Sequence, residues 1–199
     1  MKKIIPLGLL IIFLTMTGCN PFYKIFFGVR NPAFETEASI HDWTKKRDFP
    51  DVPIYTYSFE AWESKTQLPK NELFIFDKSG NFISYKNPSN LECTGPAELF
   101  LLYLDSTQTY SISDKYNLKQ ITDSLKTLDC KGINYKLRED VNFHILITFA
   151  KFPGKFIAKR TVKKWVKALE NNKNIKYELI LVDFDLQECW TEAQKKYFD

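Results

Sequence analysis

Two apolar stretches in the last third of the chain decide its fold: Phe143-His-Ile-Leu-Ile-Thr-Phe149 and Tyr177-Glu-Leu-Ile-Leu-Val-Asp-Phe184. Each has the length of a strand, and nearly unbroken apolar runs of this kind are typical of strands buried on both faces. Between them, apolar residues recur at helical spacing over residues 162–169, behind a predicted cap at Thr161. We therefore expect a βαβ unit with parallel strands and a right-handed crossover.

The same patterns predict the elements that come earlier and later in the chain. An Asp-Lys-Ser-Gly-Asn turn at residues 77–81 joins two short apolar runs and indicates a hairpin. The segment 94–104 is so apolar that we expect its helix to be largely buried. The predicted helices cover residues 36–46, 58–66, 94–104, 118–128 and 186–197, and the predicted strands cover residues 54–57, 73–76 and 82–85. Together they predict one α/β domain over residues 33–199, with a mixed sheet flanked by helices.

The first residues have the layout of an export signal. Met1-Lys2-Lys3 is positively charged, and an apolar run from Ile4 to Met16 follows it. This run is shorter than the roughly 20 residues that a membrane-spanning helix needs, and small residues close it. We predict a signal peptide over residues 1–18 and a tether over residues 19–32.

Met16-Thr17-Gly18-Cys19 resembles the lipobox of bacterial lipoproteins, although that pattern prefers Leu, Val or Ile where this chain has Met16. The resemblance implies cleavage after Gly18, a diacylglycerol thioether on Cys19 and acylation of the new amino terminus. Labelling with palmitate detects these acyl chains. Several acyl chains anchor a protein stably. The residues after Cys19 lack the acidic run of surface-export signals and lack Asp at the second position, so we expect an outer-membrane anchor that faces the periplasm. An ordinary secretory signal with a chance cysteine is the alternative.

Composition and the absence of certain motifs disfavour several classes of function. The net charge is +4, and removal of Lys2 and Lys3 with the signal lowers it to +2. This balance does not favour a nucleic-acid partner. No P-loop, GxGxxG or GxSxG motif is present, so a nucleotide-dependent enzyme or a hydrolase is disfavoured, and we expect no cofactor.

Three cysteines follow Cys19: Cys93, Cys130 and Cys189. An exported chain meets an oxidising compartment, so one disulfide is expected. All three pairings are open, and we favour Cys93 with Cys130 because both lie in polar, turn-rich stretches. The spacing fits no metal site.

Two segments resemble pieces of the thioredoxin fold. Residues 145–156, the helix around Trp165 and residues 179–185 resemble its first βαβ unit, and residues 68–83 resemble its second half. The second-half piece comes first in this chain, which implies either a circularly permuted arrangement or two units that share only local patterns. The loop at residues 151–156 holds no CxxC, so the redox site of that family is missing. The resemblance makes Pro69 a candidate cis-proline.

The chain also resembles a group of lipoproteins of unknown function from Bacteroidota-type bacteria. Residues 30–37, 76–85 and 171–188 carry this resemblance. It covers most of the chain after Cys19 and implies no particular activity.

Several side chains are candidates for chemistry. Cys93 stands at the start of a predicted helix, where the helix dipole favours a thiolate, although a structural cysteine is the more common case. Asp183 and Asp185 lie on one face of a strand and could bind a metal, but we favour a strand end that emerges into solvent. His144 is expected to be a packed core histidine. Residues that could bind an anion, or simply form a solvated helix face, are Lys155, Lys159, Arg160 and Lys163.

Two hypotheses of function follow. The first is a membrane-tethered, non-catalytic module that binds a protein or a small molecule, or supports an envelope assembly. The second is a thiol-dependent oxidoreductase or peroxidase that uses Cys93.

Overall fold

A computed structural model describes residues 30–64, 68–85, 94–133, 135–152 and 155–198. A seven-strand mixed sheet, in the order β5-β4-β3-β7-β8-β2-β6, forms the centre, and a two-strand sheet pairs β1 with β9. The strands are β1 (Phe34–Glu35), β2 (Ile54–Tyr57), β3 (Leu73–Asp77), β4 (Asn81–Ile83), β5 (Ile112–Asn117), β6 (Leu125–Thr127), β7 (Phe143–Phe149), β8 (Tyr177–Asp183) and β9 (Leu186–Gln187). The helices are α3 (Glu37–Lys45), α4 (Phe59–Glu63), α5 (Thr94–Leu102), α6 (Leu118–Asp123), α7 (Lys155–Asn171), α8 (Glu192–Lys195) and the 3₁₀ turn η2 (Lys196–Phe198).

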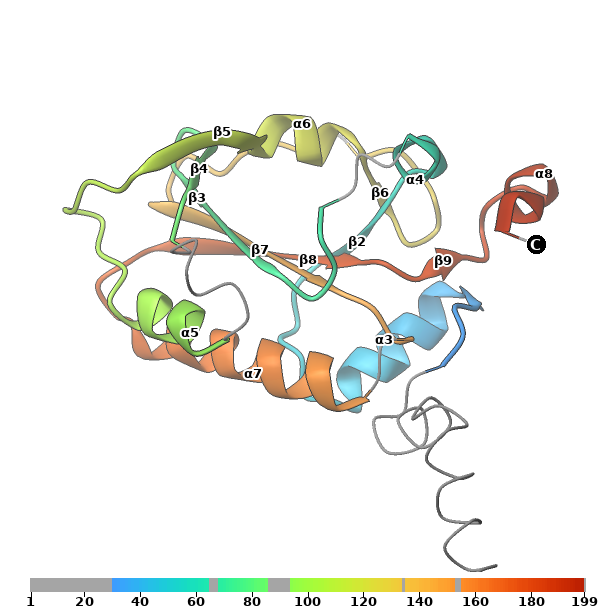
Figure 1. Cartoon of the computed structure of the whole chain (residues 1–199), viewed down its shortest axis with the longest axis horizontal. Coiled ribbons are helices and arrows are strands. Elements are labelled where there is room, and N and C mark those ends of the chain that lie inside the picture. The colour runs from blue at the N-terminus through green and yellow to red at the C-terminus, as the bar shows by residue number, and fades with distance from the viewer. Residues whose placement is uncertain (1–29, 65–67, 86–93, 134, 153–154, 199) are drawn as a thin grey trace, which may run out of the picture.

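The predicted βαβ unit forms the middle of the sheet. β7 and β8 pair in parallel, from Phe143 opposite Tyr177 to Phe149 opposite Asp183, and α7 connects them (Figure 1). Every residue of β7 is buried, which confirms the expectation of burial on both faces for this strand, whereas the first three residues of β8 are only partly buried. The predicted start of the helix at Thr161 is wrong: α7 begins at Lys155, because the helix-breaking Pro153-Gly154 pair is followed directly by residues that favour a helix.

The predicted hairpin is confirmed, and it lies beside the βαβ unit. β3 pairs antiparallel with both β4 and β7. The Asp77 carboxylate accepts hydrogen bonds from the backbone N–H groups of Ser79 and Asn81, at 2.8 and 2.9 Å. Gly80 has a φ of +81°, a conformation that a side chain would disfavour. The second strand is shorter than expected and ends at Ile83.

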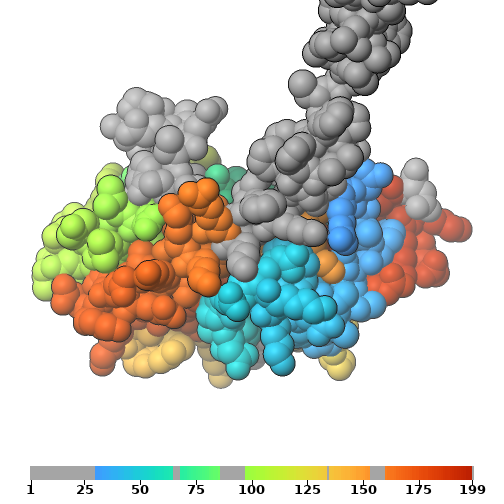
Figure 2. Space-filling view, turned by 90° about the horizontal axis from the view of Figure 1, so that it is seen from below, coloured from blue at the N-terminus to red at the C-terminus, as the bar shows by residue number. Residues whose placement is uncertain are grey.

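Helices cover both faces of the sheet (Figure 1). On one face, α3, α5 and α7 pack over a core that includes Ile145, Trp165 and Leu169. Seen from that side, α7 lies between α5 and the segment that contains α3 (Figure 2). On the other face, α4 and α6 pack over Leu146, Ile180 and neighbouring residues. The expected α/β class, with a mixed sheet flanked by helices, is therefore confirmed.

Several predicted elements differ from the structure. The helix expected over 118–128 ends at Asp123, because the chain turns at Ser124 and pairs β6 with β2. The apolar spacing of this segment fits a continuous helix, but it also fits a short helix followed by a strand, because Leu125 is buried in β6. The tail forms β9, α8 and η2 in place of one helix over 186–197. α5 is less buried than expected, with Leu99 58% exposed. The strand β5, at 112–117, was not predicted, because its exposed polar residues carry no apolar alternation.

Candidate functional site

The carboxyl ends of β7 and β8 gather polar side chains inside the protein. The sequence favoured a solvated strand end at Asp183 and Asp185, and this expectation is wrong: the two residues are 0% and 1% exposed. Asp183 lies within the sheet, opposite Phe149 of β7 and Thr56 of β2, and Asp185 lies just before β9, which pairs in parallel with β1. The sequence carries no local signal for this burial, because β1 is only two residues long and β2 lies far away in the chain.

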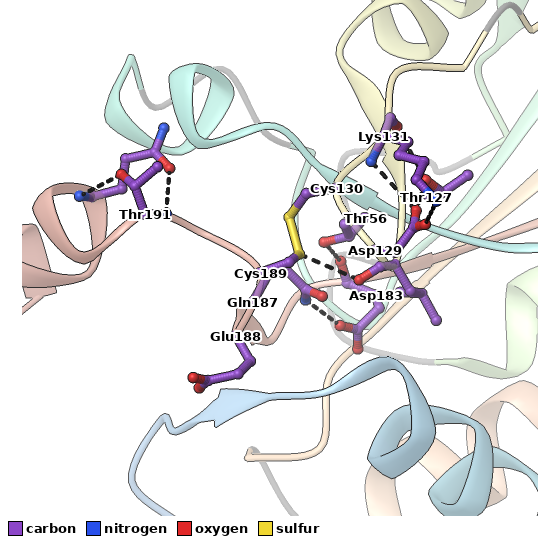
Figure 3. The surroundings of a disulfide bond; sticks show 12 residues. Thr56, Thr127, Asp129, Cys130, Lys131, Asp183, Gln187, Glu188, Cys189 and Thr191 are labelled. Carbon is purple, nitrogen blue, oxygen red and sulfur yellow. Dashed lines mark hydrogen bonds and ion pairs between the residues drawn. A yellow bond between two sulfur atoms is a disulfide. The ribbon is translucent and has the colours of Figure 1, made fainter.

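The two buried carboxyl groups are bonded to each other and to Gln187. Asp183 Oδ2 accepts hydrogen bonds from the backbone N–H of Asp185, at 3.2 Å, and from Gln187 Nε2, at 2.9 Å. Burial, and then the charge of Asp185, raise the pKa of Asp183 well above its usual range. We infer that Asp183 carries a proton and donates it to the Asp185 carboxylate, which also accepts from the Lys151 N–H at 2.8 Å. Figure 3 shows the Gln187 amide directed at Asp183.

A metal at this pair is not supported. In the described parts of the chain, no three His, Cys, Asp or Glu side chains are grouped so that they could hold a metal ion. A protonated carboxyl group is also a poor ligand for a cation, because hard cations take ionised oxygen donors. The pair instead holds the segment after β8 against the end of the sheet.

An ion pair lies next to the carboxyl groups. Lys151 Nζ bonds to Glu35 Oε2, and the two side chains are only 11% and 19% exposed. Ser39 Oγ donates to the same Glu35 oxygen at 2.6 Å and lies 3.2 Å from Lys151 Nζ. The pair therefore fastens β1 and α3 to the segment that follows β7. Beside it lies a cavity of about 90 Å³, whose lining includes Glu35, Trp43 and Lys151.

A disulfide lies near Gln187 at the same end of the sheet (Figure 3). Cys130 is bonded to Cys189, with their Cα atoms 5.9 Å apart. The favoured pairing of Cys93 with Cys130 is therefore corrected. Turn-rich sequence could not reveal the partner, because the turn after β6 meets the segment after β9 only once the sheet order is known. Cys93 lies outside the described residues.

Aromatic rings surround the ammonium of Lys70, and no motif in the sequence indicated this arrangement. Lys70 Nζ lies 4.5 Å from the ring centre of Phe152, 5.2 Å from that of Trp62 and 5.9 Å from that of Phe184. Burial lowers the pKa of Lys70, and the charge of Asp185 opposes this effect. The rings come from three different segments, so only the fold brings them together.

Of the four cations predicted to bind an anion, only Arg160 and Lys163 have described side chains. Lys163 Nζ lies 3.2 Å from Asp48 Oδ2, so this exposed carboxylate partly neutralises its charge. Arg160 is exposed. The side chains of Lys155 and Lys159 lie outside the described residues. For the described members, the solvated helix face is the better interpretation.

His144 is a core residue, as expected. It is 0% exposed, and its Nδ1 lies 2.8 Å from Glu178 Oε2. Tyr135 donates its hydroxyl hydrogen to the same oxygen at 2.6 Å. These bonds satisfy the Glu178 carboxylate and fix the loop around Tyr135 over the sheet.

The predicted signal peptide, Cys19 and most of the tether lie outside the described residues. In the part of the chain that is described, no helix is both long and apolar enough to cross a membrane. Comparison of the chain with protein-family models, with curated proteins and with solved structures found no match in any of the three.

Proposed function

We propose that this protein is a lipid-anchored domain of the bacterial cell envelope that binds a partner or ligand rather than catalysing a reaction. Lipid on Cys19 would hold it at the outer membrane, facing the periplasm. The lipobox-like Met16-Thr17-Gly18-Cys19 sequence supports the anchor. The Cys130–Cys189 bond supports an oxidising compartment, since structural disulfides are rare in the cytoplasm.

One observation carries the preference for binding: the acidic and basic groups at the carboxyl edge are bonded to one another. Asp183 is fully buried, its pKa is raised by burial and by the charge of Asp185, and Lys151 is paired with Glu35. A general acid or base must reach the proton that it transfers. These groups instead close the sheet edge, and a cavity of about 90 Å³ lies beside Lys151.

We further propose a circularly permuted thioredoxin-like arrangement for the centre of the sheet. The strand order β4-β3-β7-β8 supports it, with β7 and β8 parallel and the β3–β4 hairpin antiparallel beside β7. The Thr148 hydroxyl donates to the Pro69 carbonyl at 2.7 Å, which places the proline segment beside the end of β7. No cis peptide bond occurs among the described residues, so the guess of a cis-Pro69 is corrected.

Metabolic labelling tests the anchor and the localisation. Radioactive palmitate should enter the wild-type protein and should not enter Cys19→Ser, and only the wild type should sediment with outer membranes. Cys93→Ser is the matched control and should label like the wild type. A wild type that takes up no palmitate, or a Cys19→Ser variant that labels equally, would refute the anchor.

A thiol-dependent oxidoreductase or peroxidase is the second candidate, because two observations keep it open. Cys130 and Cys189 are bonded to each other, so neither can pair with Cys93. α5 begins at Thr94, directly after Cys93 in sequence. A Cys93 thiolate should react quickly with iodoacetamide near neutral pH. Slow alkylation of the native protein, with normal alkylation after unfolding, would exclude this candidate.

A further inference from the structure

The cavity beside the Lys151–Glu35 pair is rich in arginine. Arg30 and Arg47 both line it, although the whole chain has only four arginines among its 28 basic residues. Arginine presents a rigid fork of N–H donors that matches the oxygens of phosphate and carboxylate groups. A chain that uses lysine almost everywhere else places half of its arginines here.

Neighbouring groups hold the side chain of Arg47 and the backbone of Arg30 in position. The Arg47 guanidinium lies over the Trp43 ring, 4.1 Å from its centre, and Nη1 donates to the Trp43 carbonyl at 3.0 Å. The backbone N–H of Arg30 donates to the Phe152 carbonyl at 2.8 Å. The guanidinium of Arg47 is thus stacked on a buried ring, and the backbone of Arg30 is fixed to the segment after β7.

The charges around the cavity do not balance. Arg30, Arg47 and Lys151 supply three positive charges, and Glu35 supplies one negative charge, which leaves +2 among these lining residues. Burial lowers the pKa of Arg47, and the charge of Arg30 lowers it further. The two guanidinium groups are therefore close enough to repel each other, and an anion between them would relieve that repulsion.

We propose that this cavity binds a phosphate group between the guanidinium groups of Arg30 and Arg47. The proposal names a ligand class for the binding domain described above, and so it rests on that proposed function. A phosphate monoester carries a charge of about −1.5 to −2 near pH 7, which matches the charge of the lining. The volume of about 90 Å³ suits one acid group and is too small for a whole nucleotide.

The phosphate has two possible sources, a soluble phosphate ester or the head group of a lipid. Cys19 and Arg30 are separated by eleven peptide links, which reach at most about 40 Å when fully extended. An anchored domain would therefore keep this cavity near the membrane surface. Glycerol 3-phosphate and short-chain phosphatidic acid carry the same phosphate, without and with acyl chains, and so separate the two sources.

Titration calorimetry on the full processed protein, purified in a neutral detergent, tests the proposal. Glycerol 3-phosphate should bind, and Arg47→Gln should weaken its binding by about tenfold or more, the loss expected for one charge-assisted hydrogen bond. Arg47→Lys keeps the charge and should bind with intermediate affinity. Arg160→Gln, which removes an exposed arginine outside the cavity, should bind like the wild type. Circular dichroism should show that each variant is folded.

The outcomes are distinct. Tighter binding of phosphatidic acid than of glycerol 3-phosphate would support the lipid source, and equal binding would support a soluble ester. Absence of binding for both probes at millimolar concentration, or equal binding by Arg47→Gln and the wild type, would overturn the proposal. Palmitate labelling of Cys19 is unaffected by either result, so failure of the phosphate site can be told apart from failure of the anchor.

Discussion

The backbone N–H of Asp185 donates a hydrogen bond to the Asp183 carboxyl group, at 3.2 Å, in the interior of the protein where β8 ends. Asp183 lies opposite Phe149 of β7 and Thr56 of β2, and Gln187 and Lys151 supply hydrogen-bond donors to the two groups.

Asp183→Asn should remove a pH dependence from the stability of the protein. Because the pKa of Asp183 is raised in the folded state, its contribution is fully present below the unfolded pKa of about 3.9 and is lost as pH rises through the folded pKa. Asn copies the protonated group, since its Nδ2 can donate to Asp185. In urea denaturation, the variant should match or exceed the wild type at pH 7, and it should gain less stability than the wild type when the pH falls to 5. A variant that loses more stability at pH 7 than at pH 5 would contradict the shared proton.

The disulfide should stabilise the fold strongly. Cys130 and Cys189 are 59 residues apart, and closing a loop of this length contributes about 2–4 kcal/mol to the free energy of unfolding. The double variant Cys130→Ser/Cys189→Ser should lose that amount in a denaturant titration. Cys93→Ser is the matched control and should leave the stability unchanged. Equal destabilisation by Cys93→Ser would restore the pairing of Cys93 with Cys130.

The ion pair of Lys151 and Glu35 should matter far more than a surface pair. Glu35→Gln leaves the ammonium of Lys151 largely buried without its counter-charge, and it should cost about 2–4 kcal/mol. Asp123→Asn breaks the exposed pair with Lys119 and should cost less than about 0.5 kcal/mol. Thermal unfolding of the two variants, measured side by side, checks this contrast. Equal shifts in the melting temperature would show that the Lys151 pair does not hold the sheet edge.

The sequence predicted the parts of the fold that rest on periodicity. The parallel pair β7 and β8, the buried face of α7 and the β3–β4 hairpin follow from local patterns and one turn. The predictions for the elements at the sheet edges were wrong, because the positions of these elements depend on contacts between distant segments. Leu125 fits a helical spacing but belongs to β6, where it faces Tyr57 of β2.

The candidate site shows the same division. Asp183 and Asp185 were identified by their spacing, but the burial of Asp183 depends on its position between β7 and β2, and β2 comes more than 100 residues earlier in the chain. Arg30, Arg47 and Lys151 have no common motif, and only the packing of α3 against the end of β7 brings them to one cavity. The partner of Cys130 was missed for the same reason. The reactive side chains could be identified in the sequence, but only the tertiary structure shows which of them lie close together.

The mass of the intact protein, extracted from membranes without reduction, tests the central claim most directly. We predict a chain that begins at Cys19, carries a mass addition equal to the lipid groups, and lacks the two hydrogens lost in one disulfide. Peptide mapping should place the lipid on Cys19 and join Cys130 to Cys189. A chain that retains residues 1–18, or one cleaved elsewhere with no lipid, would contradict the account of a lipid-anchored envelope domain.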